Sequence, residues 1–327
     1  MKSNQKNIQI RVPPVIGKYT VVQNIGKGGF AQVVLAVDPK SNEKVAIKIV
    51  NRESIVQRNI LLYLENELRL TCRFNHPSIV KVLDVIYEPD IIMIIMEYYP
   101  QGDLQSVISR GVHFSVEDQL RISQQILEGL KYLHKRGVCH RDIKPENILF
   151  DDEMNPKIID FGFSKENSAM MHTFCGTPFF IAPEIVTQNQ YDGTKADVWA
   201  FGVTAHILAC GKLPWVTDNG MQLIKDMQEG KLEINIEPMG IMGAMIRNAL
   251  IVDPQERLTS DQLLSLINES KRTHISISNM TLNTKKNSAP VLPHIITKHH
   301  TSSGSMAKIL TSDRFLTRLQ FNVKRKI

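Results

Sequence analysis

The hydrophobic pattern of the chain changes character once along its 327 residues. Up to about residue 98, short β-branched runs alternate with turn signals, as in strands, and one helical stretch over residues 59–74 interrupts them. After that point, long segments with apolar residues at helical spacing dominate. The pattern predicts an α+β chain with a small β-rich N-lobe that has one main helix (about residues 19–98) and a larger helical C-lobe (about residues 99–270). The expected strands are at residues 19–26, 31–37, 44–50, 79–87 and 91–97, and the expected helices are at residues 115–137 (capped by Ser115), 195–211 and 242–252.

Charge separates an acidic body from a basic tail. Residues 271–327 contain 11 Lys and Arg and one acid, and residues 1–17 contain three Lys and Arg and no acid, so the net charge of +6 leaves about −7 for the residues between. The tail is rich in Ser, Thr and Asn and has no long strand or helical period. We expect an N-terminal extension (residues 1–18), a folded domain (19–270) and a basic, Ser/Thr-rich, largely disordered tail (271–327).

Composition argues against a membrane, secreted or zinc protein. The chain does not begin with the apolar core of a signal peptide, and its most apolar run, residues 91–96, is too short to span a bilayer, so we expect no transmembrane segment. The basic tail alone does not predict a specific nucleic-acid site, because such charge is usually solvated. The cysteines show no CxxC or Cys/His spacing, which favours a reducing compartment, the cytoplasm or the nucleus. They are Cys72, Cys139, Cys175 and Cys210.

Two short motifs point to a site. The octet HRDIKPEN, residues 140–147, places a carboxylate, an ammonium and an amide close together, and its proline prevents an ordinary helix. The stretch IGKGGFAQV, residues 25–33, joins two strand-like runs, and its glycines would let the backbone approach a phosphate chain. Alone, this stretch is also typical of a hairpin turn. It is neither a dinucleotide fingerprint, since a strand follows, nor a Walker A loop, which would end in Lys-Ser/Thr.

Together with VAIK at residues 45–48 and DFG at residues 160–162, these motifs match the protein-kinase signature in the right order. From Tyr19 to about Ile267 the chain resembles a eukaryotic-type Ser/Thr protein kinase. Its motifs KPEN, CGTPFFIAPE and DVWAFGV are most similar to the calcium/calmodulin-dependent kinase group, and next to the cyclic-nucleotide-dependent group. The resemblance implies the bilobal protein-kinase fold and transfer of the γ-phosphoryl group of ATP, with Mg²⁺, to hydroxyls of protein substrates.

The resemblance also assigns catalytic roles. Asp142 would orient the substrate hydroxyl and accept its proton, while Lys144 would stabilise the transferring phosphoryl group. Asn147 and Asp160 would hold Mg²⁺. The rival interpretation is a pseudokinase, a scaffold or binding module with the same fold. A pseudokinase normally lacks the β-strand lysine, the loop aspartate or the metal-binding aspartate, and this chain retains all three.

Lys48 would hold the α- and β-phosphates and pair with a glutamate of the N-lobe helix. Glu65 and Glu67 are the candidates, and they lie on nearly opposite faces of a helix, so only one can point inward. The distance to the HP pair at residues 76–77 resembles the family pattern for Glu67. A surface ion pair is the alternative interpretation.

The nucleotide site implied by the resemblance has a glycine-rich loop and an adenine pocket. The loop consists of Ile25, Gly26, Lys27, Gly28, Gly29, Phe30, Ala31, Gln32 and Val33. The pocket is formed by Ile25, Val33, Ala46 and Leu149, with Met96 at the back, backbone groups of Glu97 and Tyr99 at the adenine edge, and Asp103 near the ribose or a basic substrate residue. For each apolar member, ordinary core packing is an equally good interpretation. Ala31 replaces the third glycine of the family pattern, so a stiffer loop is expected.

Regulation by phosphorylation is implied by Arg141 and by MHTFCGTP at residues 171–178. A phosphate on Thr173 would give Arg141 an anionic partner and order the loop, whereas a plain polar role is the alternative for Thr173. Thr177 would instead hydrogen-bond near Asp142 and Lys144.

Two further pairs carry structural expectations. Glu184 and Arg257 would form a buried ion pair that braces the C-lobe. Asp197 and Trp199 would anchor its central helix.

Substrate preference and the tail are the remaining expectations. Asp103 and Glu146 resemble the acids that hold an upstream arginine in basophilic kinases, and Phe163 resembles the bulky residue associated with serine preference, although both acids could instead be solvated. Residues 312–327 have the pattern of a basic amphipathic helix. Such a segment can lie on an acidic membrane, bind calmodulin or fold back on the domain as an autoinhibitory contact, and the charge of the domain favours the last. A solvated tail is the alternative, because one short helix is marginal in water.

Overall fold

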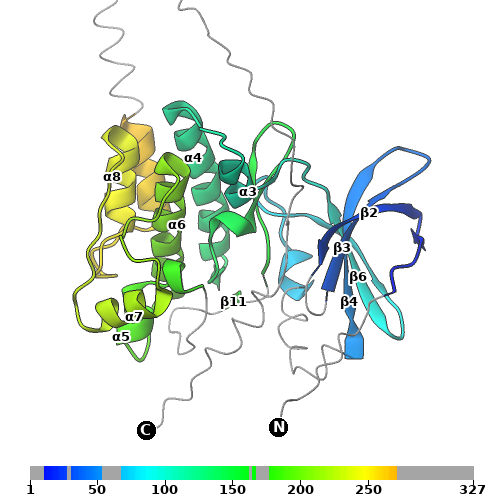
Figure 1. The fold of residues 1–327 in the computed structure, drawn as a ribbon, viewed down its shortest axis with the longest axis horizontal. Helices are drawn as coiled ribbons and strands as arrows, with labels where there is room; N and C mark the ends of the chain where they lie inside the picture. Colours follow the sequence, from blue (N-terminus) through cyan, green and yellow to red (C-terminus); the bar gives the residue numbers. More distant parts are fainter. Residues whose placement is uncertain (1–10, 28–30, 54–67, 162–163, 167–176, 271–327) are drawn as a thin grey trace, which may run out of the picture.

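Two lobes of different secondary structure make up the part of the chain that the computed structural model describes, residues 11–27, 31–53, 68–161, 164–166 and 177–270. Figure 1 shows a sheet lobe formed by the N-terminal residues beside a helical lobe formed by the residues that follow. The two-lobed α+β fold predicted from the sequence is confirmed. Within the described residues, helices that are both long and apolar enough to cross a membrane are absent.

The N-lobe is a six-stranded antiparallel sheet in the order β1-β2-β3-β4-β6-β5. Its strands are β1 (Val15–Ile16), β2 (Tyr19–Lys27), β3 (Ala31–Val37), β4 (Lys44–Asn51), β5 (Val82–Tyr87) and β6 (Ile91–Glu97). Strand β1 lies in the expected N-terminal extension, and its Ile16 is buried in the core of the lobe, so the packed chain begins before Tyr19. Most of the helix expected over residues 59–74 falls outside the described residues, of which residues 68–71 are helical.

The two faces of this sheet differ because successive strand residues point to opposite sides. In β4, Val45, Ile47 and Ile49 are buried on one face with apolar residues of the neighbouring strands. Ala46 and Lys48 point to the other face and are only half-buried. One face therefore forms the main core of the lobe, while the other has a second buried cluster around Val50 and Ile94 and is partly open beside Ala46 and Lys48.

The C-lobe contains mainly helices, with two small sheets, β10-β9-β7 and β11-β8. Its helices are α3 (Leu104–Ser109), α4 (Val116–His134), the 3-10 helices η1 (Pro145–Asn147) and η2 (Pro178–Phe180), α5 (Pro183–Thr187), α6 (Gly193–Cys210), α7 (Gly220–Gln228), α8 (Gly240–Ala249) and a helix over residues 260–270. Its strands are β7 (Gly102–Asp103), β8 (Val138–Cys139), β9 (Ile148–Phe150), β10 (Pro156–Ile158) and β11 (Lys165–Glu166).

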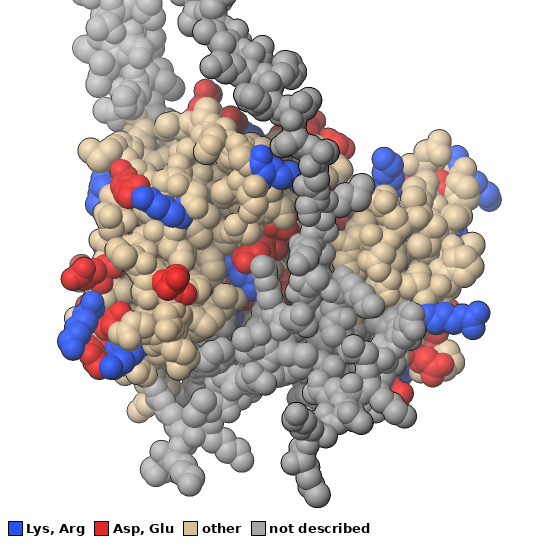
Figure 2. Space-filling model, in the orientation of Figure 1, with Lys and Arg blue, Asp and Glu red and all other residues tan. Residues whose placement is uncertain are grey.

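Helices α4 and α6 form the centre of this lobe. Helix α4 begins where the sequence predicts, because the Ser115 side chain accepts a hydrogen bond from the Asp118 N–H. Helix α6 is buried on all sides, and its Gly202 lets α8 approach closely: a Cβ at this position would lie 2.9 Å from the Cβ of Ala249. Figure 2 shows acidic and basic side chains scattered over the surface of the helical lobe, with side chains of both signs at the centre of the view, where the lobes meet.

A buried ion pair fastens the chain after α8 to the rest of the C-lobe. The Arg257 guanidinium donates to both carboxylate oxygens of Glu184, at 2.6 and 2.9 Å, and both side chains are fully buried. Arg257 also donates to the Ile251 carbonyl and lies over the Trp199 ring. This pair agrees with the sequence expectation for Glu184 and Arg257.

Replacing Arg257 by Met should destabilise the domain by about 3–5 kcal/mol, because it leaves the Glu184 carboxylate buried without its charged partner. Lys225→Met is the control, since Lys225 pairs with Glu229 on an exposed helix face and should contribute less than about 0.5 kcal/mol. Urea unfolding followed by circular dichroism measures both. An Arg257→Met variant as stable as the control would contradict the bracing role.

Candidate active site

The octet of residues 140–147 lies on a loop between β8 and β9 that brings its polar side chains together. The Lys144 Nζ lies 2.8 Å from the Asp142 Oδ2, and the Asn147 Nδ2 donates to the same oxygen at 2.8 Å. The Asn147 Nδ2 also donates to the Asp142 backbone carbonyl, at 2.7 Å. All three residues are at most 4% exposed, so these bonds form out of water, where they are strong. The convergence expected from the octet is therefore present.

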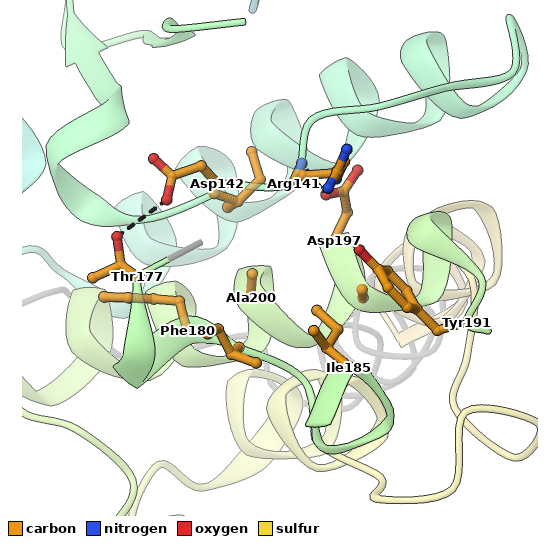
Figure 3. A pocket seen from close by; sticks show the side chains of 11 residues that line it. Arg141, Asp142, Thr177, Phe180, Ile185, Tyr191, Asp197 and Ala200 are labelled. Atoms are coloured by element: carbon orange, nitrogen blue, oxygen red, sulfur yellow. Dashed lines mark hydrogen bonds between the residues drawn. The ribbon is translucent and has the colours of Figure 1, made fainter. Parts of the chain in front are cut away.

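Thr177 completes this cluster from the segment just before η2. The Lys144 Nζ donates to the Thr177 Oγ1 at 2.8 Å, and the Thr177 hydroxyl donates to the Asp142 Oδ1 at 3.1 Å (Figure 3). Both oxygens of the Asp142 carboxylate thus accept from fixed donors. These bonds fix the orientation of the Asp142 carboxylate. They also confirm the prediction that Thr177 hydrogen-bonds near Asp142 and Lys144.

The backbone at the start of the loop is held by a buried carboxylate from α6. The Asp197 Oδ2 accepts from the His140 N–H at 2.8 Å, and its Oδ1 accepts from the Arg141 N–H at 2.7 Å. Arg141 has a φ of 70°, in the left-handed region that costs a non-glycine residue about 1–3 kcal/mol. Asp197 therefore stabilises a strained conformation directly next to Asp142.

Asp160, the second expected metal ligand, lies on a segment bound to the same loop. The Ile159 N–H donates to the Asn147 carbonyl at 3.0 Å, and the His140 Nε2 donates to the Ile159 carbonyl at 2.9 Å. The His140 Nδ1 in turn accepts from the Asp142 N–H. Asp160 also has a positive φ, 68°, so both flanks of the site contain strained backbone.

The oxygen atoms of Asn147 and Asp160 fit a magnesium ion. Both N–H bonds donated by the Asn147 amide go to Asp142, so the amide oxygen is the polar atom that remains for a cation. Asp160 adds carboxylate oxygens from the adjoining segment. Amide and carboxylate oxygens are the protein ligands that Mg²⁺ prefers, so these residues suit the group implied by the resemblance.

An aromatic stack fixes the residue after Asp160. The Phe161 ring meets the His140 ring edge-on at 5.0 Å and the Phe74 ring at 5.1 Å. Phe74 closely follows the helical residues 68–71, so the stack connects the C-lobe loop to the chain of the N-lobe. Sequence reasoning missed Phe74, because no motif contains it.

The expected nucleotide residues of the sheet share its half-open face. Strand pairing places Val33 opposite Lys48 and Ala46 opposite Met96, and all four side chains are half-buried. Met96 also packs against the large core cluster of the C-lobe, so this end of the face meets the C-lobe. Their contact with a nucleotide stays a prediction.

The ends of β2 and β3 carry the described part of the glycine-rich loop. Ile25 lies at a register shift between Asn24 and Gly26, and Gly26 pairs with Val33. Ala31 begins β3 with extended backbone and packs in the core. The alanine therefore needs no left-handed conformation here, and Gln32 beside it is half-buried.

Other expected nucleotide residues already have partners within the protein. The Tyr99 hydroxyl donates to the Glu97 carboxylate at 3.1 Å, and burial raises the pKa of this phenol. Leu149 packs against the C-lobe core from β9. Asp103 caps α3: its carboxylate accepts from the N–H and the hydroxyl of Ser106, both at 2.8 Å. Asp103 is 5% exposed, so this cap is its clearest role in the structure.

Several residues with a predicted role lie outside the described residues. They are Gly28, Gly29, Phe30, Glu65, Glu67, Phe163, Thr173 and the tail segment over residues 312–327, and the same holds for the side chain of Lys27. Their roles stay predictions.

A small cavity lies behind the catalytic loop, between this loop, η2, α5 and α6 (Figure 3). Its volume of about 20 Å³ suits a water molecule and is far too small for a nucleotide. Its lining combines apolar side chains with the polar residues Arg141, Asp142, Thr177, Tyr191 and Asp197. The cavity therefore cannot receive the nucleotide.

Comparison with known proteins agrees with this geometry. The family model described as "Protein kinase domain" matches residues 19–266. The chain belongs to the protein kinase family, whose members in general use ATP and a divalent metal.

Two relatives illustrate the similarity, and both are named as kinases. CBL-interacting serine/threonine-protein kinase 18 of Arabidopsis thaliana is 34% identical over 255 residues, which cover 76% of this chain and 49% of the relative. NUAK family SNF1-like kinase 1 of Homo sapiens is 32% identical over 294 residues, which cover 89% of this chain and 44% of the relative. The chain thus spans about half the length of the curated relatives it matches.

Replacing Thr177 by Val should lower kcat for peptide phosphorylation by about 10–100-fold while the KM for ATP changes little, because the hydroxyl that joins Lys144 to Asp142 is lost from a buried cluster. Thr177→Ser keeps the hydroxyl and is the matched control. Steady-state kinetics with both variants gives the answer. Equal kcat values for the valine and serine variants would show that the hydroxyl is dispensable.

Proposed function

We propose that the chain is an active, ATP- and Mg²⁺-dependent serine/threonine protein kinase rather than a pseudokinase. The observation that carries the proposal is the buried cluster in which Lys144, Asn147 and Thr177 all bond to the Asp142 carboxylate. A scaffold has no need to hold a carboxylate and an ammonium together out of water, because their burial costs free energy. A phosphoryl-transfer site needs both at fixed positions.

Each residue then has a defined task. Asp142 orients the substrate hydroxyl and accepts its proton, and Lys144 donates to an oxygen of the group in transfer. Mg²⁺, held by the oxygens of Asn147 and Asp160, neutralises phosphate charge when bound. Lys48 holds the α- and β-phosphates, with Glu67 as its partner. The half-open sheet face with Val33, Ala46 and Met96 receives the adenine.

For the substrate, we propose a basic residue upstream of the phosphorylated serine. The carboxylate of Asp103 is buried and caps α3, so Glu146, on η1 within the catalytic loop, is the better placed of the two expected acids. Glu146 is half-buried and lies two residues from Lys144. A peptide array in which an upstream arginine gives no gain in rate would contradict this preference.

Free thiols suit a location in the cytoplasm or nucleus. Among the described cysteines, Cys72, Cys139 and Cys210 form no disulfide. A fluorescent fusion found outside both compartments would overturn this assignment.

Asp142→Asn and Lys48→Met should each reduce phosphate transfer from radiolabelled ATP to a serine peptide by at least about 100-fold, since one removes the proton acceptor and the other the phosphate contact. Asp152→Asn and Lys44→Met are matched controls, because both side chains are exposed, on the turn after β9 and on β4. Controls and wild type should have equal rates. Transfer by Asp142→Asn at the wild-type rate would mean that a contaminating kinase produces the measured activity. That result would favour the pseudokinase interpretation.

We propose that phosphorylation of Thr173 activates the enzyme. Arg141 precedes the catalytic aspartate in a strained conformation, and an anion near its guanidinium would form short charge-assisted hydrogen bonds. Thr173→Ala should lower kcat by about 10-fold or more at saturating ATP and Mg²⁺. Mass spectrometry must first show that wild type is phosphorylated at Thr173. An alanine variant as active as the phosphorylated enzyme would rule out this switch.

The basic tail is proposed to restrain the domain. The positive charge of the tail complements the net charge of about −7 on residues 18–270, so the two attract each other. Calmodulin is the alternative partner of the segment over residues 312–327.

Ending the chain at Ser270 should raise peptide phosphorylation by a few-fold at low ionic strength, and the gain should shrink as salt screens the attraction. A matched full-length chain with Lys324, Arg325 and Lys326 changed to Gln should show part of the same gain. Calcium-loaded calmodulin added to the wild type tests the alternative partner. Identical rates for full-length and shortened chains at every salt concentration would show that the tail does not restrain the kinase domain.

A further inference from the structure

The segment between β6 and β7, which connects the two lobes, contains a buried tyrosine. Tyr99 is 7% exposed and belongs to the large core cluster of the C-lobe. Its hydroxyl donates to the Oε2 of Glu97, the last residue of β6, at 3.1 Å. Burial and the Glu97 carboxylate raise the pKa of the Tyr99 phenol, so the hydroxyl keeps the proton that it donates. The bond fixes these two side chains relative to each other.

A lysine of β10 contacts the same tyrosine. The Lys157 Nζ lies 5.7 Å from the centroid of the Tyr99 ring, which is within the range of cation–π attraction. The Lys157 Nζ also donates to the Pro77 carbonyl at 2.7 Å and lies 3.4 Å from the Asp151 Oδ2. Its side chain is 15% exposed. The ammonium therefore joins three segments of the chain: the one before β5, the one after β6 and the one after β9.

Backbone bonds link two of these segments independently. The Ile158 N–H donates to the Ser78 carbonyl at 2.8 Å, and the Val80 N–H donates to the Ile158 carbonyl at 3.0 Å. The Lys81 carbonyl then accepts from the Glu97 N–H at 3.1 Å. Residues 78–81 thus connect β10 to the end of β6. The Tyr99 and Lys157 side chains add a second connection between the same two places.

This network lies next to the groups expected at the adenine. Lys157 pairs with Leu149 in the β9–β10 ladder, and Leu149 is expected in the adenine pocket. The backbone groups of Glu97 and Tyr99 are expected at the adenine edge. Backbone groups that are already held in their bound position bind a ligand more tightly, because less ordering remains to be done on binding.

The surface pair of Lys81 and Glu97 cannot supply this restraint. Its charged atoms are 3.9 Å apart, and the two side chains are 60% and 42% exposed. Exposed pairs of this kind contribute little. The buried tyrosine is therefore the main side-chain restraint on this part of the chain.

We propose that Tyr99 is a positioning residue for the nucleotide: with Glu97 and Lys157, its side chain fixes the backbone that meets the adenine edge. The network sets the affinity for the nucleotide and leaves the transfer step at Asp142 unchanged. The effect on affinity rests on the proposed function, whereas the effect on the backbone does not.

Two conservative replacements separate the parts of the network. Tyr99→Phe removes the hydroxyl and keeps the ring, and Lys157→Met removes the ammonium and keeps an unbranched apolar side chain. Tyr87→Phe and Lys135→Met are the matched controls, because Tyr87 is 64% exposed and Lys135 is also on the surface.

Three measurements on the full chain test the proposal. They are the Kd of ADP with Mg²⁺ by calorimetry, kcat and KM for ATP with a serine peptide, and NMR hydrogen exchange of the Glu97 and Gln101 amides. These amides flank Tyr99 and donate to the Lys81 and Phe150 carbonyls.

We expect Tyr99→Phe to raise the Kd of ADP and the KM for ATP about 3–10-fold with kcat within about two-fold of wild type, because one hydrogen bond to a charged acceptor is lost. Both amides should exchange at least about five-fold faster. Lys157→Met should change all three quantities in the same direction, and the controls should match the wild type.

Each outcome decides part of the proposal. A folded Tyr99→Phe variant with the Kd and the amide exchange of Tyr87→Phe overturns the positioning role, as does a loss confined to kcat. Lys157→Met values equal to those of Lys135→Met remove the lysine from the network. If Lys157→Met does not fold, Tyr99→Phe alone decides the role of the tyrosine.

Failure of the proposed function gives a different pattern. A wild type that binds ADP and transfers no phosphate contradicts the kinase function, while a raised Kd in Tyr99→Phe still supports the positioning role. A wild type that binds no nucleotide overturns both the proposed function and the effect on affinity. Faster exchange of the two amides in Tyr99→Phe would then support the effect on the backbone alone.

Discussion

The catalytic loop depends on one buried carboxylate. Asp197 receives the backbone N–H groups of His140 and Arg141 and the ring of His134, so a single side chain of α6 joins the loop to the end of α4. Because Arg141 adopts a left-handed conformation that a non-glycine residue disfavours, the loop would relax without these bonds. The orientation of Asp142 is thus a property of the C-lobe core rather than of the loop alone.

The rest of the C-lobe makes this anchor rigid. Helix α6 is buried on every side, and the Arg257–Glu184 ion pair next to it holds the chain after α8 against the rest of the lobe. The stack of Phe74, Phe161 and His140 extends the same support toward the N-lobe and positions the segment of Asp160. Such layered support is what a site needs when rate depends on placing groups to within about 1 Å.

Sequence reasoning was strongest where chemistry and local pattern coincide. The convergence of Asp142, Lys144 and Asn147 follows from a short proline-containing motif, and the strands follow from β-branched alternation. Strand β1 was missed because two residues are too few for a period to be visible. Two contacts could not be predicted. The family resemblance assigns Asp103 to the ribose or a basic substrate residue, and this assignment hid its role as the cap of α3. The contact between His134 and Ser260 joins residues 126 positions apart. Glu67 and Thr173 stay predictions.

The most direct test of the account is the kinetics of Asp197→Asn, which keeps the shape of the side chain but replaces one acceptor oxygen by an N–H₂ group that faces N–H donors. We expect kcat for a serine peptide to fall by about 100-fold or more, while the KM for ATP stays within about two-fold and the variant unfolds cooperatively, because the nucleotide face is untouched and only the placement of Asp142 is lost. A folded Asp197→Asn variant with wild-type kcat would contradict the claim that this carboxylate holds the catalytic loop.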